Sequence, residues 1–168
     1  MTLSFGKTSP QDMLEKAERD LARLEASESA QDATAASDAV FDLAVSVTSL
    51  KDWLKEHLPA PASKQVEPYV AASLPLSSFR DIANGGKHRV IRNYTPRTNE
   101  VTASATVVID SALTAEHFTQ RPQPGSQPWR LKIIRADQSR HRAVELGHSA
   151  IQEWRTFMSI HGVVHNET

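Results

Sequence analysis

Apolar side chains recur at helical spacing in the first third of the chain. The longest such run, from Val40 to Leu58, repeats every three or four residues over about five turns. An earlier run follows Ser9 and Pro10, a pair typical of a helix start because serine caps the first turn and proline suits the first helical position. Two helices are therefore predicted. The Ala- and Ser-rich segment between them, 26–37, contains the turn and has the composition of a flexible connection or of a helix extension.

Prolines and glycines divide the next part of the chain. Pro59 and Pro61 end the second helix, since proline lacks the amide hydrogen that a helix interior requires. Short helices are predicted at 65–72 and at about 76–86, the second of them ended by Gly85-Gly86. These short helices are predicted to complete a bundle with the first two.

After His88 the period of the apolar pattern changes from helical to two. The alternation predicts strands at 89–94, 101–109 and 129–133. Three neighbouring strands of this kind favour a small antiparallel meander over a parallel sheet. The long connection 111–128, which contains Arg-Pro-Gln-Pro-Gly, is predicted to be exposed.

A last helix completes the predicted fold. It starts at Asp137 or Ser139 and ends at Gly162, and its apolar arc contains Trp154. Together with Trp53 of the second helix, Trp154 is predicted to lie in a common core. The predicted fold class is therefore α+β and mostly helical, in a single domain. Its parts are a helical bundle over 9–86 and 137–161 and a three-stranded antiparallel sheet over 89–135, inserted before the last helix, within the domain 1–168.

The composition limits the cellular compartment and the kinds of covalent and metal-binding site that the chain can form. The chain of 168 residues has no cysteine, which excludes disulfides and thiolate metal sites and is typical of a reducing compartment. No apolar run has the length of a signal peptide or of a transmembrane helix. We therefore expect a cytoplasmic protein that makes no contact with a membrane.

The net charge of −1 conceals an uneven distribution. Residues 1–59 hold 6 basic and 11 acidic residues, whereas residues 80–142 hold 11 basic and 5 acidic residues. A basic middle suits a phosphate-bearing partner such as RNA. It equally suits docking onto the acidic N-terminal half of the same chain, and both interpretations stay open.

The candidate site lies at the start of the basic region. On a helix that turns about 100° per residue, five polar residues of different chemistry share an arc of about 120°: Arg80, Asp81, Asn84, Lys87 and His88. The opposite side carries Phe79, Ile82 and Ala83. In this arrangement Arg80 and Lys87 can hold an anion, and Asp81 can orient the His88 imidazole. Alternatively the polar face is simply solvated, and Gly85-Gly86 breaks the helix before Lys87 and His88 join the arc.

A second set of candidate ligands lies in the predicted last helix. His141, Glu145 and His148 are spaced four and three residues apart, which places them on one helix face as metal ligands can be. The apolar arc of that helix points away from them, so a solvated outer face is the favoured interpretation. We therefore expect neither a metal nor a cofactor. The sequence also has no serine nucleophile elbow, phosphate loop or Rossmann glycine pattern.

Three segments of the chain resemble a group of small uncharacterised bacterial and phage proteins. They are the helix end Val-Thr-Ser-Leu-Lys-Asp-Trp-Leu, the stretch Phe-Arg-Asp-Ile-Ala-Asn-Gly-Gly-Lys-His, and the closing Ala-Ile-Gln-Glu-Trp-Arg-Thr-Phe-Met-Ser-Ile-His-Gly. The group in turn resembles, more distantly, the HEPN superfamily of helical-bundle proteins. Many members of that superfamily are metal-independent endoribonucleases with an arginine–histidine motif, which two protomers bring together in a composite site.

This resemblance implies a homodimer and assigns roles to the polar arc. Arg80 would be the motif arginine, Asp81 the polar residue after it and His88 the histidine; seven residues lie between Arg80 and His88, more than the motif usually has. Two hypotheses follow. The first is a non-catalytic binding or assembly protein of a phage-derived or defence-type locus, which the unusual spacing and the near-neutral charge favour. The second is an RNA endonuclease in which Arg80 and Lys87 hold the phosphate, His88 transfers protons, Asp81 orients it and Asn84 adds a hydrogen bond.

Overall fold

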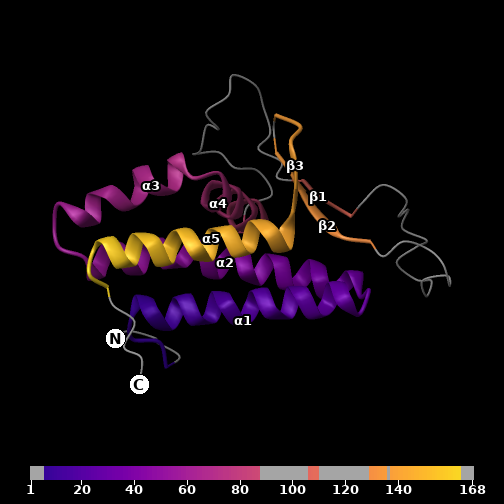
Figure 1. The fold of residues 1–168 in the computed structure, drawn as a ribbon, viewed down its shortest axis with the longest axis horizontal. Helices are drawn as coiled ribbons and strands as arrows, with labels where there is room; N and C mark the ends of the chain where they lie inside the picture. Colours follow the sequence, from indigo (N-terminus) through magenta and orange to yellow (C-terminus); the bar gives the residue numbers. More distant parts are fainter. Residues whose placement is uncertain (1–5, 88–105, 110–128, 136, 164–168) are drawn as a thin grey trace.

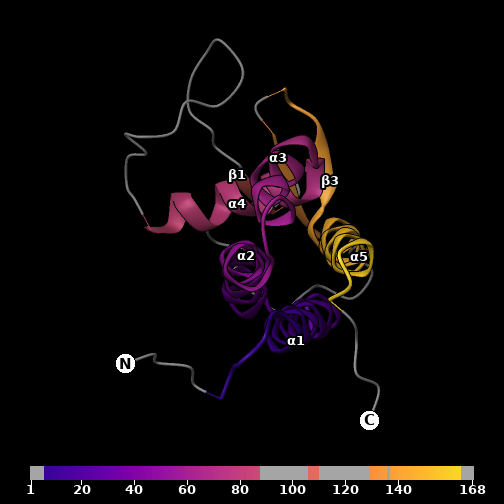
Figure 2. The same ribbon diagram turned by 90° about the vertical axis from the view of Figure 1, so that its left-hand side faces the viewer.

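Helices make up most of the structure, a computed structural model that describes residues 6–87, 106–109, 129–135 and 137–163. The helices are α1 (Pro10–Ser29), α2 (Ala33–His57), η1 (Ala62–Gln65), α3 (Val66–Ala72), α4 (Leu74–Lys87) and α5 (Ala143–Ile160), and the strands are β1 (Thr106–Ile109), β2 (Leu131–Ile134) and β3 (Arg140–Arg142). The predicted α+β class is thus confirmed. Figure 1 shows α1, α2 and α5 running alongside one another, with the sheet at the end where α5 begins. Seen from the end, α4 lies across α2 (Figure 2).

The predicted start of the first helix is confirmed, and of the two alternatives for 26–37 the structure shows the helix extension, with the turn inside it. Ser9 and Asp12 form a capping box, in which the Asp12 amide donates to Ser9 Oγ at 3.2 Å and the Ser9 amide donates to Asp12 Oδ2 at 2.9 Å. Only residues 30–32 separate α1 from α2. Asp32 caps α2 by accepting from the Ala35 amide at 3.0 Å. Alanine's high helix propensity extends both helices into the segment 26–37, so that the turn predicted within it is only three residues long.

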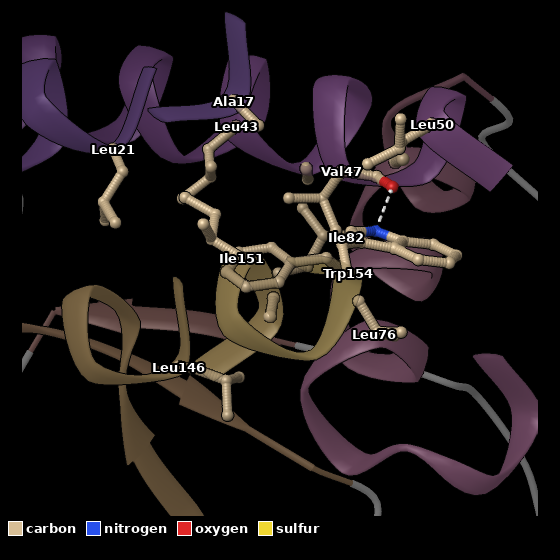
Figure 3. Packing of buried hydrophobic residues seen from close by; sticks show 14 of the residues in the cluster. Ala17, Leu21, Leu43, Val47, Leu50, Leu76, Ile82, Leu146, Ile151 and Trp154 are labelled. Carbon is tan, nitrogen blue, oxygen red and sulfur yellow. Dashed lines mark hydrogen bonds between the residues drawn. The ribbon is translucent and has the colours of Figure 1, made fainter. Parts of the chain in front are cut away.

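The core lies between α1, α2, α4 and α5. Trp154 is 1% exposed, and its Nε1 donates to the Val47 carbonyl at 3.0 Å (Figure 3). Gly147 of α5 sits so close to the other two helices that a Cβ there would lie 2.7 Å from Leu21 Cδ1 and 3.1 Å from Leu43 Cδ2. A residue without a side chain therefore allows the three helices to approach this closely.

The prediction that both tryptophans lie in the core is right for Trp154 and only partly right for Trp53. Trp53 packs against the core but is half-buried. At the other end of α5, Gly162 has a positive φ of 69°, and the Val163 amide donates to the Met158 carbonyl at 2.9 Å. This is a glycine helix end as predicted. Among the described helices, none combines the length and the apolarity needed to cross a membrane.

The sheet is antiparallel, in the order β1-β2-β3, but its third strand is not one that the sequence predicts. Ile133 of β2 lies opposite Val107 of β1 on one side and opposite His141 of β3 on the other. The predicted strands at 101–109 and 129–133 correspond to β1 and β2, with 101–105 outside the described residues. The predicted strand at 89–94 and the connection 111–128 also lie outside them.

The prediction that the last helix starts at Asp137 or Ser139 is wrong. Asp137 Oδ1 instead accepts from the amide of Ser139 at 2.9 Å and from its hydroxyl at 2.6 Å, and Gln138 has a φ of 67°. These contacts make a tight turn between β2 and β3. Arg140–Arg142 then pairs with β2, and α5 begins only at Ala143. The sheet therefore extends past the predicted boundary at residue 135.

Two side chains from the end of α1 attach the sheet to the bundle. The buried Glu28 accepts the Leu131 amide on Oε1 at 2.8 Å. Gln31 accepts the Trp129 amide at 2.9 Å and donates to the Trp129 carbonyl at 3.3 Å. Both backbone groups of Trp129 are thus satisfied by one side-chain amide, which acts as a neighbouring strand would. These contacts fix β2 against the α1–α2 turn.

Candidate functional site on helix α4

Helix α4 carries the predicted polar arc and starts earlier than predicted. Ser73 precedes it and accepts the Leu76 amide on its Oγ at 3.0 Å, so this serine caps the first turn. The helix continues through Gly85 and Gly86 to Lys87, so these glycines do not break it before Lys87. The face predicted to be apolar is buried, with Phe79, Ile82 and Ala83 all in the core.

Arg80 and Asp81 form an ion pair along the helix surface. Arg80 donates from Nε and Nη2 to Asp81 Oδ1 at 3.2 and 3.1 Å. Their side chains are only 14% and 18% exposed. Burial raises the pKa of Asp81 above its usual range, although the neighbouring Arg80 guanidinium and, more weakly, the charge of Arg135 act in the opposite direction. The carboxylate is therefore held mostly away from water.

A second guanidinium, which the sequence does not predict as part of the site, comes from the end of β2. Arg135 Nη1 donates to the Leu74 carbonyl at 3.1 Å and to Ser78 Oγ, and it lies 3.4 Å from Ser77 Oγ. Arg135 therefore ties the sheet to the first turn of α4. Its charge also reaches Asp81, which places that carboxylate in the field of two arginines.

The remaining members of the predicted arc are placed only in part. Asn84 is half-buried on α4, one turn after Arg80 and Asp81. Lys87 is the last residue of the helix, and its side chain is not described. His88 lies outside the described residues, so the predicted contact between Asp81 and His88 remains a prediction.

The second candidate set, His141, Glu145 and His148, does not share a helix face as predicted. His141 belongs to β3 and contacts Ser139 Oγ at 3.1 Å. Glu145 accepts from Arg142 at 2.9 Å, and His148 contacts Glu25 at 2.7 Å. Across the described ranges, no three His, Asp or Glu residues are grouped so that they could hold a metal ion.

The described part of the arc is a network of two arginines around a mostly buried carboxylate. Each guanidinium contacts groups of the protein itself: Arg80 binds Asp81, and Arg135 binds the start of α4. Such charge-assisted hydrogen bonds are among the stronger polar contacts in proteins, and they fix side-chain positions. The arrangement can therefore hold α4 in place, and its partly exposed edge at Arg80 and Asn84 can contact a partner.

The raised pKa of Asp81 predicts a pH-dependent contribution to stability. The folded protein binds this proton more tightly than the unfolded chain, whose aspartates titrate near about 3.9. Between the two pKa values the folded state therefore holds more protons, and the contribution of Asp81 to stability increases as the pH falls through the folded pKa. At neutral pH this contribution is at its least favourable.

Urea unfolding at several pH values, for the wild type and Asp81→Asn, measures this effect. The wild type is expected to gain stability relative to Asp81→Asn as the pH falls from neutral towards about 4. The difference between the two unfolding free energies cancels the contributions of other carboxylates, such as Asp12. The hydrogen bond from the Thr8 amide lowers the pKa of Asp12, so its protonation destabilises the fold. A difference that shrinks on acidification would mean that the Asp81 pKa is lowered, and that the Arg80 pair outweighs burial.

Comparison with known proteins leaves the HEPN resemblance a prediction. No family model matches the sequence, no curated protein matches it, and no solved structure matches the fold. The function of the chain therefore has to follow from its own residues.

Proposed function

We propose that the chain is a non-catalytic binding or assembly protein in which the polar residues of α4 hold the fold together. The observation that carries this proposal is the Arg80–Asp81 pair, mostly buried and hydrogen-bonded within the protein. An arginine that stabilises charge on a substrate has to direct its donors at the reacting group. The donors Nε and Nη2 of Arg80 are directed at Asp81 instead.

Arg135 supports the same proposal from the opposite side. It connects β2 to Leu74 and Ser78, and it counters part of the cost of burying the Asp81 charge. Two basic residues that satisfy carbonyls, hydroxyls and a carboxylate of the same chain are typical of a structural network. A phage-derived or defence-type locus, which the resemblance implies, is part of this proposal.

A HEPN-like RNA endonuclease is the second candidate, and the continuity of α4 favours it. Because the helix passes through Gly85 and Gly86, Lys87 stays on the element that carries Arg80 and Asn84. In this candidate Arg80 and Lys87 would hold a phosphate, and His88 would act as general acid or base. A composite site would also require the homodimer that the resemblance implies.

The two candidates differ in what Arg80→Ala changes. If Arg80 is a structural residue, Arg80→Ala should lower the free energy of unfolding by about 1–3 kcal/mol, because Asp81 loses a hydrogen-bond partner. Purified wild type is then expected to leave a varied panel of RNAs intact. Arg155→Ala is the matched control, since Arg155 forms an exposed pair with Glu18 at 2.8 Å and its loss should cost less than about 1 kcal/mol.

The measurement is unfolding and RNA turnover on the same preparations. RNA cleavage by the wild type, lost in both Arg80→Ala and His88→Ala with unchanged melting curves, would replace the proposal with the nuclease candidate. Melting of Arg80→Ala that matches the Arg155→Ala control would remove the structural role of the pair.

A further inference from the structure

The face of the sheet that points away from the core is basic. Leu131 and Ile133 of β2 are fully buried, so the residues that alternate with them lie on the other face. Directly opposed residues of antiparallel strands share a face. Lys132 lies opposite Arg142, and Ile134 lies opposite Arg140. With Arg130, two positions before Lys132, this gives the basic sheet face, defined as Arg130, Lys132, Arg140 and Arg142.

Carboxylates lie beside two of the three arginines of the basic sheet face. Glu28 Oε2 lies 3.8 Å from Arg130 Nε and 3.9 Å from Arg142 Nη2, and Glu145 pairs with Arg142 at 2.9 Å. Arg140 is exposed, and it forms no ion pair with any residue in the described ranges. Among the residues that the structure describes, Glu145 and the buried Glu28 are the carboxylates that lie against Arg130 and Arg142.

The spacing of these cations suits a chain of regularly repeated negative charges. Residues two positions apart on a strand are separated by about 6.6 Å, and neighbouring strands by about 4.8 Å. Long side chains on such a grid can each contact a different anionic group. Three of the four are arginines, whose planar fork matches phosphate oxygens better than a lysine ammonium does.

The basic sheet face offers no aromatic side chain among its four members, and the nearest tryptophan points the other way. Trp129 lies two positions before Leu131, so it belongs to the same side of the chain as Leu131, and it packs against the core. Proteins that read single-stranded bases commonly stack them on exposed aromatic rings. The described residues of this face therefore favour contact with the backbone of a nucleic acid over contact with its bases.

We propose that the basic sheet face binds the phosphodiester backbone of nucleic acid without sequence preference. The proposal names a partner for the binding function proposed above and rests on it. Arg140 would make a new phosphate contact directly, whereas Arg142 would have to share its guanidinium between phosphate and Glu145. The buried Glu28 would keep Arg130 and Arg142 positioned on the sheet.

Fluorescence anisotropy with labelled single-stranded RNA and DNA of the same mixed sequence tests this. We expect a Kd on the order of 10⁻⁴ to 10⁻⁶ M at physiological salt, equal for RNA and DNA within about tenfold. With phosphate contacts from the three arginines, log K should fall with log salt concentration with a slope of about −2. Arg140→Ala should weaken binding about three- to tenfold at low salt and reduce the slope by about 0.7.

Two further variants make the test specific. Glu145→Gln releases Arg142 from its pair and is expected to tighten binding severalfold. Arg19→Ala removes the same charge as Arg140→Ala from an exposed position on α1, outside the sheet, and should leave binding within about twofold. The melting curve of Arg140→Ala should match the wild type, which shows that any lost binding is not lost folding.

Three results would overturn the proposal: no binding of either oligonucleotide at about 100 µM protein, equal losses in Arg140→Ala and Arg19→Ala, or a preference for RNA above about tenfold, which would point to 2′-hydroxyl contacts. Absence of binding by a stable protein that does not cleave RNA rejects the basic sheet face and leaves the binding or assembly proposal standing. Cleavage of the RNA probe instead rejects the non-catalytic function proposed above and leaves the basic sheet face standing.

Discussion

Replacing Trp154 by alanine is expected to lower the free energy of unfolding by about 3–5 kcal/mol, the usual cost of deleting a large buried aromatic side chain. Trp154 is almost completely buried and lies between α2 and α4 (Figure 3). Its ring meets Phe157 edge to face at 5.9 Å, and its indole nitrogen satisfies the Val47 carbonyl. Alanine would leave a cavity at the centre of the core.

Trp53→Ala is the matched control for this prediction. It deletes the same side chain from a half-buried position on α2, and we expect a loss of about 1–2 kcal/mol. Urea unfolding of both variants, with unchanged slopes against denaturant, gives the comparison. Equal losses for the two variants would mean that Trp53 is as much a part of the core as the sequence pattern predicts.

The helices were predictable because local periodicity and local caps decide them. The apolar stripe of α2 and the Ser9 capping box are both visible within a few residues of sequence. The turn predicted within 26–37 is present at residues 30–32, but the composition left open whether the rest of the segment is flexible or helical, and it is helical because Asp32 caps α2 directly after the turn. Composition describes a tendency, whereas a single capping side chain sets the boundary.

Neither strand β3 nor the contact between Arg135 and α4 could be predicted from a local sequence pattern. Arg140, His141 and Arg142 have no apolar alternation, and they form a strand because β2 offers its free edge after a tight turn. Arg135 contacts Leu74 and Ser78, which lie more than fifty residues earlier in the chain. No local pattern signals such a contact, and the sequence predicted the polar arc without its second arginine.

The burial of Asp81 was also beyond the sequence. A helical wheel places Asp81 on a polar face, from which solvent exposure is the natural expectation. The sheet, however, brings Arg135 to the start of α4, and the Asp81 side chain remains only 18% exposed. Burial of this carboxylate beside two guanidiniums changes the interpretation of the arc from an open site to a structural network.

Replacing Arg135 by methionine should therefore destabilise the protein by about 2–3 kcal/mol, in the range of charge-assisted hydrogen bonds. Methionine keeps much of the apolar stem but removes the donors to Leu74 and Ser78. The backbone contacts of Arg135 in the β2–β3 turn, with Ser139 and Gln138, do not involve the side chain and should persist. The loss therefore reports on the connection between the sheet and α4.

Arg140→Ala is the control, because it removes an exposed arginine from the same hairpin and should change stability by less than about 0.5 kcal/mol. A second measurement, the pKa of Asp81 from its carboxyl chemical shift, tests whether Arg135 acts on the α4 network or only as an exposed charge. Arg135 lowers that pKa in the wild type, so Arg135→Met should raise it further, whereas Arg140→Ala should leave it unchanged. The opposite result would be an Arg135→Met protein as stable as Arg140→Ala, with an unchanged Asp81 pKa. Arg135 would then not stabilise α4, and its guanidinium would be available to bind a ligand.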